Sequence, residues 1–245
     1  MRLTLKFTCL LSLFVLLPSL YSSLDTFTSS RATYYGSPDG LGTPSGACGF
    51  GEYGRKINSG NVGAVAKLYR NGIGCGACYQ VRCTQPQLCT KDGVKILVTD
   101  HGQGDNTDFI LSSHGFKELA RPTMTTELMA LGVVDIEYRR VSCKYPGHNL
   151  TLKVDENSKF PDYLAIIILY QGGQKDITAI QLWQDNVKEW RAMRRAYGGV
   201  WDMANPPEGA LNLRFLASGK WVQLKNVIPS DWKAGMAYDS HFQLL

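Results

Sequence analysis

The distribution of cysteine divides this chain before any secondary structure is considered. Six of the seven cysteines lie between Cys48 and Cys143, and none follows Cys143. All five tryptophans, in contrast, lie at or after Trp183. Disulfides stabilise small, loop-rich modules with a modest core, whereas large aromatic side chains build a core by packing. The chain is therefore predicted to fold as two modules, the first cross-linked and the second held together by packing.

The N-terminal segment has the layout of a secretory signal peptide. Arg2 and Lys6 give a basic start, residues 7–17 are almost entirely apolar, and small polar residues follow. This apolar run is shorter than the ~20 residues that a membrane-spanning helix needs, which disfavours a membrane anchor. We predict a signal peptide at residues 1–23, which contains Cys9, and a mature protein that is secreted to the extracellular space without membrane attachment.

The six remaining cysteines have two interpretations. Cys75, Cys78, Cys83 and Cys89 lie close enough together for a zinc site, but a secreted chain keeps its thiols oxidised, which favours disulfides. Six cysteines allow 15 connectivities, and spacing alone does not select one. We expect no metal and no organic cofactor.

Charge excludes one class of partner. Removing Arg2 and Lys6 with the signal peptide leaves 24 of the 26 basic residues against 21 acidic ones, a net charge of about +3. This value is too small to indicate nucleic-acid binding. Nothing in the sequence argues for an oligomer, so a monomer is expected.

Strand signals dominate both modules and predict an all-β fold. Short β-rich runs between clusters of Gly, Pro, Asn and Ser occupy residues 32–35, 79–82, 94–99, 133–138, 163–170, 177–183, 189–194, 211–217 and 221–227. A single stretch, 117–130, has helical character, and Pro122 limits its length. We assign residues 24–146 to the first domain, 147–161 to a linker that holds a glycosylation sequon at Asn149, and 162–245 to a β-sandwich domain.

Several segments resemble the plant expansins. They are Tyr-Tyr-Gly at 34–36, Gly-Ala-Cys-Gly at 46–49, the cysteine segment 74–83, the segment 132–143 and, in the second module, 163–165, 172–173, 197–201 and 227–232. Segments 30–38 and 107–112 are most similar to the expansin-like B branch. The resemblance implies a six-stranded double-psi β-barrel, as in barwin and family 45 endoglucanases, followed by an immunoglobulin-like β-sandwich. It also implies the disulfides Cys48–Cys75, Cys78–Cys143 and Cys83–Cys89.

A barrel of this kind hydrolyses a glycan only when two carboxyl groups are correctly placed. An inverting glycosidase holds its acid and base roughly 6.5–9.5 Å apart. Asp100 matches a functional aspartate of the family. The second family aspartate belongs to a His-Phe-Asp-Leu-Ser motif, which here reads Asp-Phe-Ile-Leu-Ser, so Asp108 occupies the histidine position and Ile110 the acid position.

Asp108 is an alternative acid, but it lies about 7 Å further along the strand than the family position, a larger shift than catalytic placement tolerates. We therefore expect hydrolysis to be lost, with Asp100 and Asp108 as vestigial catalytic candidates only. His101 and His114 are interpreted as exposed loop residues, because no serine or cysteine nucleophile pairs with them by motif.

Binding is better supported than cleavage. Flat aromatic rings with a polar tip bury the C–H faces of a glucan at little conformational cost. The polysaccharide-binding residues that the resemblance implies are Thr33, Tyr34, Tyr35 and Asp100 in the barrel and Tyr163 and Tyr197 in the second domain. Trp201 shares strand parity with Tyr197 and is predicted to extend this set, with a place in the core as the open alternative. The other tryptophans, Trp183, Trp190, Trp221 and Trp232, are predicted to serve ordinary packing.

The primary hypothesis is a secreted plant cell-wall protein that binds wall polysaccharide, cellulose or a matrix glucan, and loosens the wall without hydrolysis. One alternative is a weak glycan hydrolase with Asp100 as base and Asp108 as acid. Another is a barwin-like defence or lectin module without a role in wall mechanics.

Overall fold

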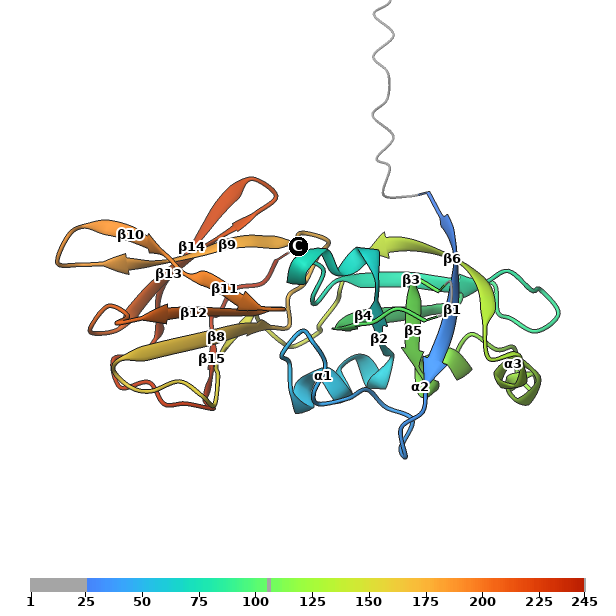
Figure 1. Ribbon diagram of the computed structural model, residues 1–245. Coiled ribbons are helices and arrows are strands. Elements are labelled where there is room, and N and C mark those ends of the chain that lie inside the picture. The colour runs from blue at the N-terminus through green and yellow to red at the C-terminus, as the bar shows by residue number, and fades with distance from the viewer. Residues whose placement is uncertain (1–25, 105–106, 245) are drawn as a thin grey trace, which may run out of the picture.

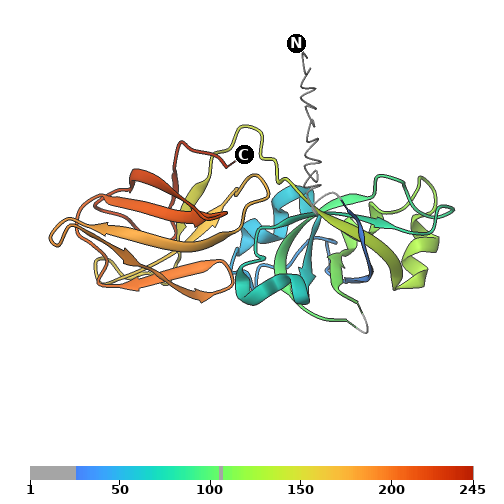
Figure 2. The same ribbon diagram turned by 90° about the horizontal axis from the view of Figure 1, so that it is seen from above.

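The computed structural model describes residues 26–104 and 107–244, so the signal peptide predicted at 1–23 lies outside the described residues. The described chain forms two β-rich domains that lie side by side (Figures 1 and 2). In the residues described, no helix has the length and apolar character needed to cross a membrane.

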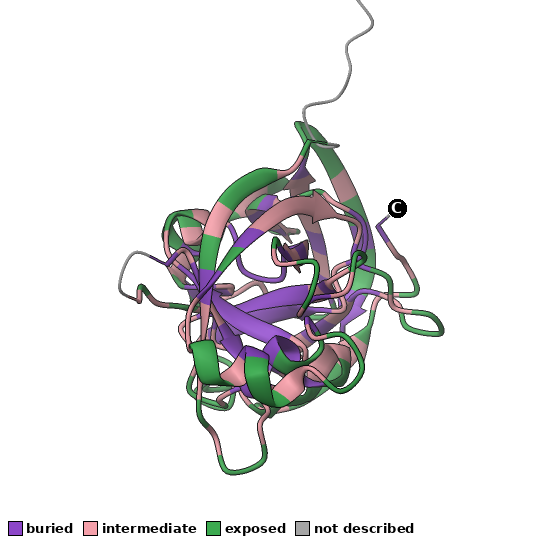
Figure 3. Cartoon of the chain, turned by 90° about the vertical axis from the view of Figure 1, so that its right-hand side faces the viewer, coloured by how far each residue is buried: buried purple, intermediate pink, exposed green. Residues whose placement is uncertain are grey.

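The first domain is a closed six-stranded barrel with the strand order β1-β5-β2-β4-β3-β6. Its strands are β1 (Thr28–Tyr35), β2 (Val62–Val65), β3 (Cys78–Cys83), β4 (Val94–His101), β5 (Phe109–Ser112) and β6 (Val134–Val141). The pairs β1–β5 and β2–β4 are parallel, and the other neighbours are antiparallel. Alternate side chains such as Val98, Phe109 and Ile136 fill the interior, and buried strand segments occupy the centre of the end-on view (Figure 3).

Short helices connect the barrel strands. They are α1 (Glu52–Lys56), η1 (Ile57–Gly60), η2 (Lys67–Gly72), α2 (Ser113–Lys117) and α3 (Thr125–Leu131). The helical stretch predicted at 117–130 therefore contains only the last residue of α2 and most of α3, and residues 118–124 belong to neither helix. Ser112 caps α2, because its Oγ accepts a hydrogen bond from the Gly115 amide at 3.0 Å, and the chain resumes a helix only after Pro122.

The second domain is a sandwich of two antiparallel sheets. Its strands are β7 (Thr151–Val154), β8 (Tyr163–Leu169), β9 (Ile177–Gln184), β10 (Glu189–Ala192), β11 (Arg194–Tyr197), β12 (Val200–Ala204), β13 (Leu211–Ala217), β14 (Lys220–Ile228) and β15 (Ala237–Asp239). One sheet has the order β10-β9-β13-β14, and the other has the order β11-β12-β8-β7-β15. The predicted all-β fold class, a barrel followed by a sandwich, is confirmed.

The linker predicted at 147–161 is too long. Residues 151–154 form β7, which pairs with β8 on one side and β15 on the other. Leu150, Leu152 and Val154 are fully buried in the sandwich core, so the alternation of a half-buried strand begins well before residue 162. The chain enters the second domain at about residue 150.

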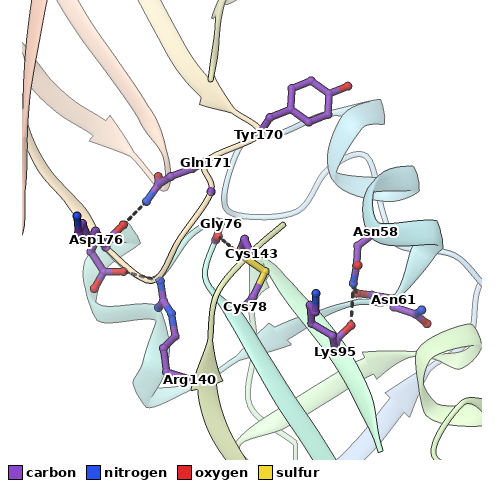
Figure 4. Close-up of a disulfide and its surroundings, with 12 residues drawn as sticks. Asn58, Asn61, Gly76, Cys78, Lys95, Arg140, Cys143, Tyr170, Gln171 and Asp176 are labelled. Carbon is purple, nitrogen blue, oxygen red and sulfur yellow. Dashed lines mark hydrogen bonds and ion pairs between the residues drawn. A yellow bond between two sulfur atoms is a disulfide. The ribbon is translucent and has the colours of Figure 1, made fainter. Parts of the chain in front are cut away.

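The three disulfides are Cys48–Cys75, Cys78–Cys143 and Cys83–Cys89, the pairing implied by the resemblance. Because Cys75, Cys78, Cys83 and Cys89 are all oxidised, they form no zinc site. Cys78–Cys143 joins β3 to the segment that follows β6, near the contact between the domains (Figure 4).

The two domains share a buried contact. The residues Ala165, Ile167 and Leu169 of β8 belong to the same hydrophobic cluster as Phe50 of the barrel. An ion-pair network also joins the domains. The Asp176 carboxylate accepts from Arg70 at 2.7 Å, and it accepts from Arg140 at 3.0 Å, the contact drawn in Figure 4. The relative position of the domains is thus set by packing as well as by the connecting chain.

Candidate functional site

Four residues form a line across the wall of the barrel, which we call the barrel row. Thr33 on β1 is paired with Ile110 on β5, Ile110 with Ala64 on β2, and Ala64 with Asp100 on β4. Directly opposite residues project to the same face of a sheet. Neighbouring strands lie about 4.8 Å apart, so the Cα atoms of Asp100 and Ile110 are separated by about 10 Å. Ile110 therefore lies on the same line as Asp100 and supplies no carboxyl group.

The Asp100 carboxylate is held by the main chain. Its Oδ1 accepts hydrogen bonds from the backbone amides of Ala47, at 2.6 Å, and His101, at 2.8 Å. Tyr35 lies close enough for the two groups to interact, since burial and then the charge of Asp100 raise the pKa of Tyr35 to about 12. Asp100 is a fixed, half-buried acceptor at the end of the barrel row.

Asp108 has a different set of partners. Its Oδ2 accepts from the Ser30 hydroxyl of β1 at 2.8 Å, and its charge, after burial, contributes to a raised pKa of Tyr138 on β6. Among the described residues, Asp108 and Asp100 share no hydrogen-bond partner. The structure thus directs the Asp108 carboxylate toward β1 and β6, whereas Asp100 faces the loop that contains Ala47.

The other predicted barrel residues are partly occupied by packing. Tyr34 lies opposite the buried Leu111, its ring packs on Phe116 at 4.8 Å between centroids, and its hydroxyl donates to the Met129 carbonyl oxygen at 3.2 Å. The Thr33 hydroxyl donates to the carbonyl oxygen of Gly132 at 2.8 Å. Tyr34 therefore faces the barrel interior, while Thr33 remains in the barrel row with its hydroxyl bonded to the end of α3.

The loop Gly46–Gly49 connects the barrel row to the second domain. Its Ala47 amide donates to Asp100, and its Cys48 carbonyl oxygen accepts from the Gly199 amide at 3.0 Å. A Cβ atom built on Gly49 would be 2.9 Å from the Tyr197 ring, so this ring lies directly against the loop. Asp100 and Tyr197, which lie far apart in the sequence, are thus joined through one short segment.

Tyr197 and Tyr163 lie on the outer face of the five-stranded sheet. The Tyr197 side chain is 52% exposed. Tyr163 is half-buried, and its hydroxyl donates to Oδ2 of Asp202 at 2.9 Å. Arg194 contacts the same carboxylate with two hydrogen bonds of 2.9 and 2.6 Å, and these bonds hold the pKa of Asp202 below its usual value despite burial. An ionised Asp202 therefore fixes the orientation of Tyr163.

Trp201 is not part of this face, and the prediction that it extends the aromatic set is wrong. Its side chain is 5% exposed and belongs to the sandwich core, with the Arg195 guanidinium 4.1 Å from its ring. Tyr197 pairs with Val200, and Arg195 pairs with Trp201, with a register shift between Arg195 and Tyr197. Strand parity counted across the turn therefore fails, and Trp201 faces the core.

Sequence reasoning did not identify several residues of this surface. Tyr69 stacks on the exposed His101, with ring centroids 4.4 Å apart, and its hydroxyl reaches the Ala47 carbonyl oxygen at 3.4 Å. Arg194 and Asp202 were also missed as supports of Tyr163. Arg194 and Asp202 alternate with Arg195 and Trp201 along β11 and β12. This alternation indicates a contact between Arg194 and Asp202 only when the pairing of the two strands is known.

We call the surface formed by Asp100, the loop Gly46–Gly49, Tyr197 and Tyr163 the interdomain surface. It combines a fixed carboxylate, an exposed aromatic ring and an oriented tyrosine, which can bind a polyhydroxylated ligand by hydrogen bonds and ring contacts. It places no second carboxyl group in the barrel row for general acid–base chemistry.

The sequon at Asn149 lies just before β7. Its side chain is half-buried, and Nδ2 donates to the Asp239 carboxylate at 3.2 Å. The Thr151 hydroxyl donates to the Asn149 carbonyl oxygen at 3.1 Å. Glycosylation of Asn149 stays a prediction.

Comparisons with known proteins agree with this architecture. Residues 61–138 match the family model described as Lytic transglycolase, and residues 150–229 match the Expansin C-terminal domain. Expansin-like B1 of Arabidopsis thaliana is 53% identical over 235 residues, which cover 94% of each chain. Expansin-like B1 of Oryza sativa subsp. japonica is 48% identical over 226 residues, which cover 89% of this chain and 88% of that protein.

Two solved structures have the same fold. The apo expansin of Clavibacter michiganensis and a variant of it in complex with cellohexaose each superpose with a TM-score of 0.68 and are 21% identical. Each comparison covers 89% of this chain and 98% of the bacterial chain. The chain therefore belongs to the expansin family, and its similarity to the two expansin-like B1 proteins confirms the predicted expansin-like B branch.

Proposed function

We propose that this protein is secreted to the plant cell wall, where it binds cellulose or a matrix glucan across the interdomain surface and loosens the wall without cleaving glycosidic bonds. The observation that carries this proposal is the loop Gly46–Gly49, which contacts both Asp100 and Tyr197. An extended glucan can then contact both domains at once. The bacterial expansin solved with cellohexaose supports a β-glucan as the ligand class.

Loosening without cleavage follows from what the surface provides. Ring contacts and hydrogen bonds from the protein compete with the contacts between neighbouring glucan chains. The chains are then separated by the free energy of binding, and no glycosidic bond is cleaved. In the barrel row, Ile110 lies two strands from Asp100, where an acid would be needed, and Asp108 is bonded to Ser30. These contacts support binding over the hydrolase alternative.

Binding to insoluble cellulose is expected to weaken about ten-fold on Tyr197→Ala, because the exposed ring is the largest apolar contact of the interdomain surface. Tyr197→Phe keeps the ring and should retain most of the affinity. Met236→Ala, a change at another exposed apolar side chain, is the matched control and should bind normally. A depletion assay over a range of protein concentrations measures all four proteins, and full affinity in Tyr197→Ala would refute the proposed surface.

The same preparations should release no new reducing ends from soluble or insoluble glucans, while heat-inactivated wall strips under load should extend when the protein is added. Sustained release that disappears in Asp100→Asn would instead establish the hydrolase. Normal glucan binding with no extension at any pH would leave a lectin-like module, the remaining alternative.

A further inference from the structure

The four-stranded sheet, the upper layer of the sandwich in Figure 1, has an outer face that the barrel does not cover. The barrel packs instead on β8 and β12 of the other sheet. Along β9 and β13, buried residues such as Leu182 and Leu213 alternate with residues on this outer face. Three tryptophans lie there, of which Trp183 and Trp190 are half-buried and Trp221 is exposed. Of the four tryptophans predicted to serve packing, only Trp232 lies in the sandwich core.

An arginine is stacked between two of these rings. The Arg214 guanidinium carbon is 4.5 Å from the ring centres of both Trp190 and Trp221. Its Nε donates to Oε1 of Gln181 at 2.7 Å. Within residues 26–104 and 107–244, its two Nη groups donate to no protein acceptor. The guanidinium is therefore held in a fixed plane with the fork that binds a carboxylate still available.

The face is also hollowed. A depression of about 480 Å³ is lined by Trp183, Trp190, Asn212, Gln223, Lys225 and Asn226. This volume is within the range of small-molecule sites, about 300–1,000 Å³. The depression combines ring faces with side-chain amides, which donate and accept hydrogen bonds as sugar hydroxyls require.

Two cations on this face lack a carboxylate partner among the described residues. Neither Arg214 nor Lys225 forms an ion pair with a carboxylate in the part of the chain that the structure describes. Asp185, at the neighbouring hairpin, accepts from the Trp183 indole at 3.0 Å and pairs with Lys188 at 3.3 Å. A ligand that carries carboxylates would supply the missing partners.

We propose that this outer face binds an acidic polysaccharide, one whose pyranose units carry carboxylates. Trp183, Trp190 and Trp221 contact the C–H faces of the sugar rings, and Arg214 and Lys225 bind the carboxylates. A purely structural role, in which the stacking of Arg214 stabilises the sheet, would explain the position of Arg214. It would not explain the amide-lined depression or the unpaired Lys225. This site is independent of the interdomain surface and lies on the other sheet, so one protein molecule can bind two different polymers.

The test is a titration with oligogalacturonate, an uncharged methyl-esterified form of the same oligomer and a cello-oligosaccharide, followed by tryptophan fluorescence. Wild-type protein should bind the charged oligomer at least ten-fold more tightly than the esterified one. Lys225→Gln and Arg214→Lys should each weaken binding about five- to ten-fold, the second because an ammonium cannot form the bidentate contact. Tyr197→Ala should leave this affinity unchanged.

Lys91→Gln removes the same charge from an exposed loop of the barrel and is the matched control. An equal loss in Lys91→Gln and Lys225→Gln would show non-specific attraction and overturn the proposal. Equal affinity for the esterified oligomer would make the face a neutral-glycan site and overturn it as well, as would the absence of binding. Because Lys225 is exposed, its substitution keeps the test valid even if changes at Arg214 disturb the sheet.

Discussion

Replacing Cys78 and Cys143 together with alanine is expected to lower the free energy of unfolding of the barrel by about 4 kcal/mol. The bridge joins residues 65 positions apart, and in the loop-entropy description a loop of this size restricts the unfolded chain by about that amount. Both cysteines are also buried, in a small cluster with Val62 and Leu97, so their removal disturbs packing as well.

The Cys83–Cys89 bridge provides the control, since its cysteines are only 6 positions apart and the same description gives about 2 kcal/mol. Urea unfolding should be followed by two signals. All five tryptophans lie in the sandwich, so their fluorescence reports on that domain, whereas circular dichroism reports on both. Equal losses for the two double variants would contradict the loop-entropy argument.

The fold was predictable because its signals are local. Alternation of apolar and polar residues marks β13, and turn residues separate most of the strands, so the β-rich class follows from short windows of sequence. The same alternation runs through Leu150, just before β7, and Leu152 and Val154 within it, but β7 is only four residues long and lies inside the predicted linker. Short strands contain too few alternations to stand out from a loop.

The site was less predictable because its contacts are not local. Tyr197 was identified by resemblance, but its contact with Gly49 depends on how two domains pack. The pairing of Arg194 with Asp202 depends on the register of β11 and β12, including the register shift between Arg195 and Tyr197. Trp201 faces inward because its neighbour Val200 pairs with Tyr197, and adjacent residues of a strand point to opposite faces. The sequence predicts packing for the outer-face tryptophans because aromatic residues in a sandwich usually fill its core. Only the exposure of these side chains in the structure distinguishes an outer-face tryptophan from a core one.

The contact that aligns the two halves of the interdomain surface requires glycine. Gly198 has a φ of +46°, and a Cβ atom at this position would be 2.2 Å from the carbonyl oxygen of Ala47. The same loop holds Asp100 through the Ala47 amide. A side chain at Gly198 would therefore push the loop Gly46–Gly49 away from the sandwich and shift Asp100 relative to Tyr197.

Gly198→Ala is accordingly expected to destabilise the protein by several kcal/mol and to reduce glucan binding more than ten-fold. Gly219→Ala is the matched control, because Gly219 also has a positive φ, +74°, but a Cβ atom there meets nothing within 4 Å. It should cost only the backbone strain, about 1–2 kcal/mol, and leave binding unchanged. Urea unfolding and cellulose depletion measure the two effects separately. If Gly198→Ala bound glucan as well as Gly219→Ala does, glucan binding would not depend on the contact between Gly198 and the loop Gly46–Gly49. The proposal that one ligand spans both domains would then lose its main support.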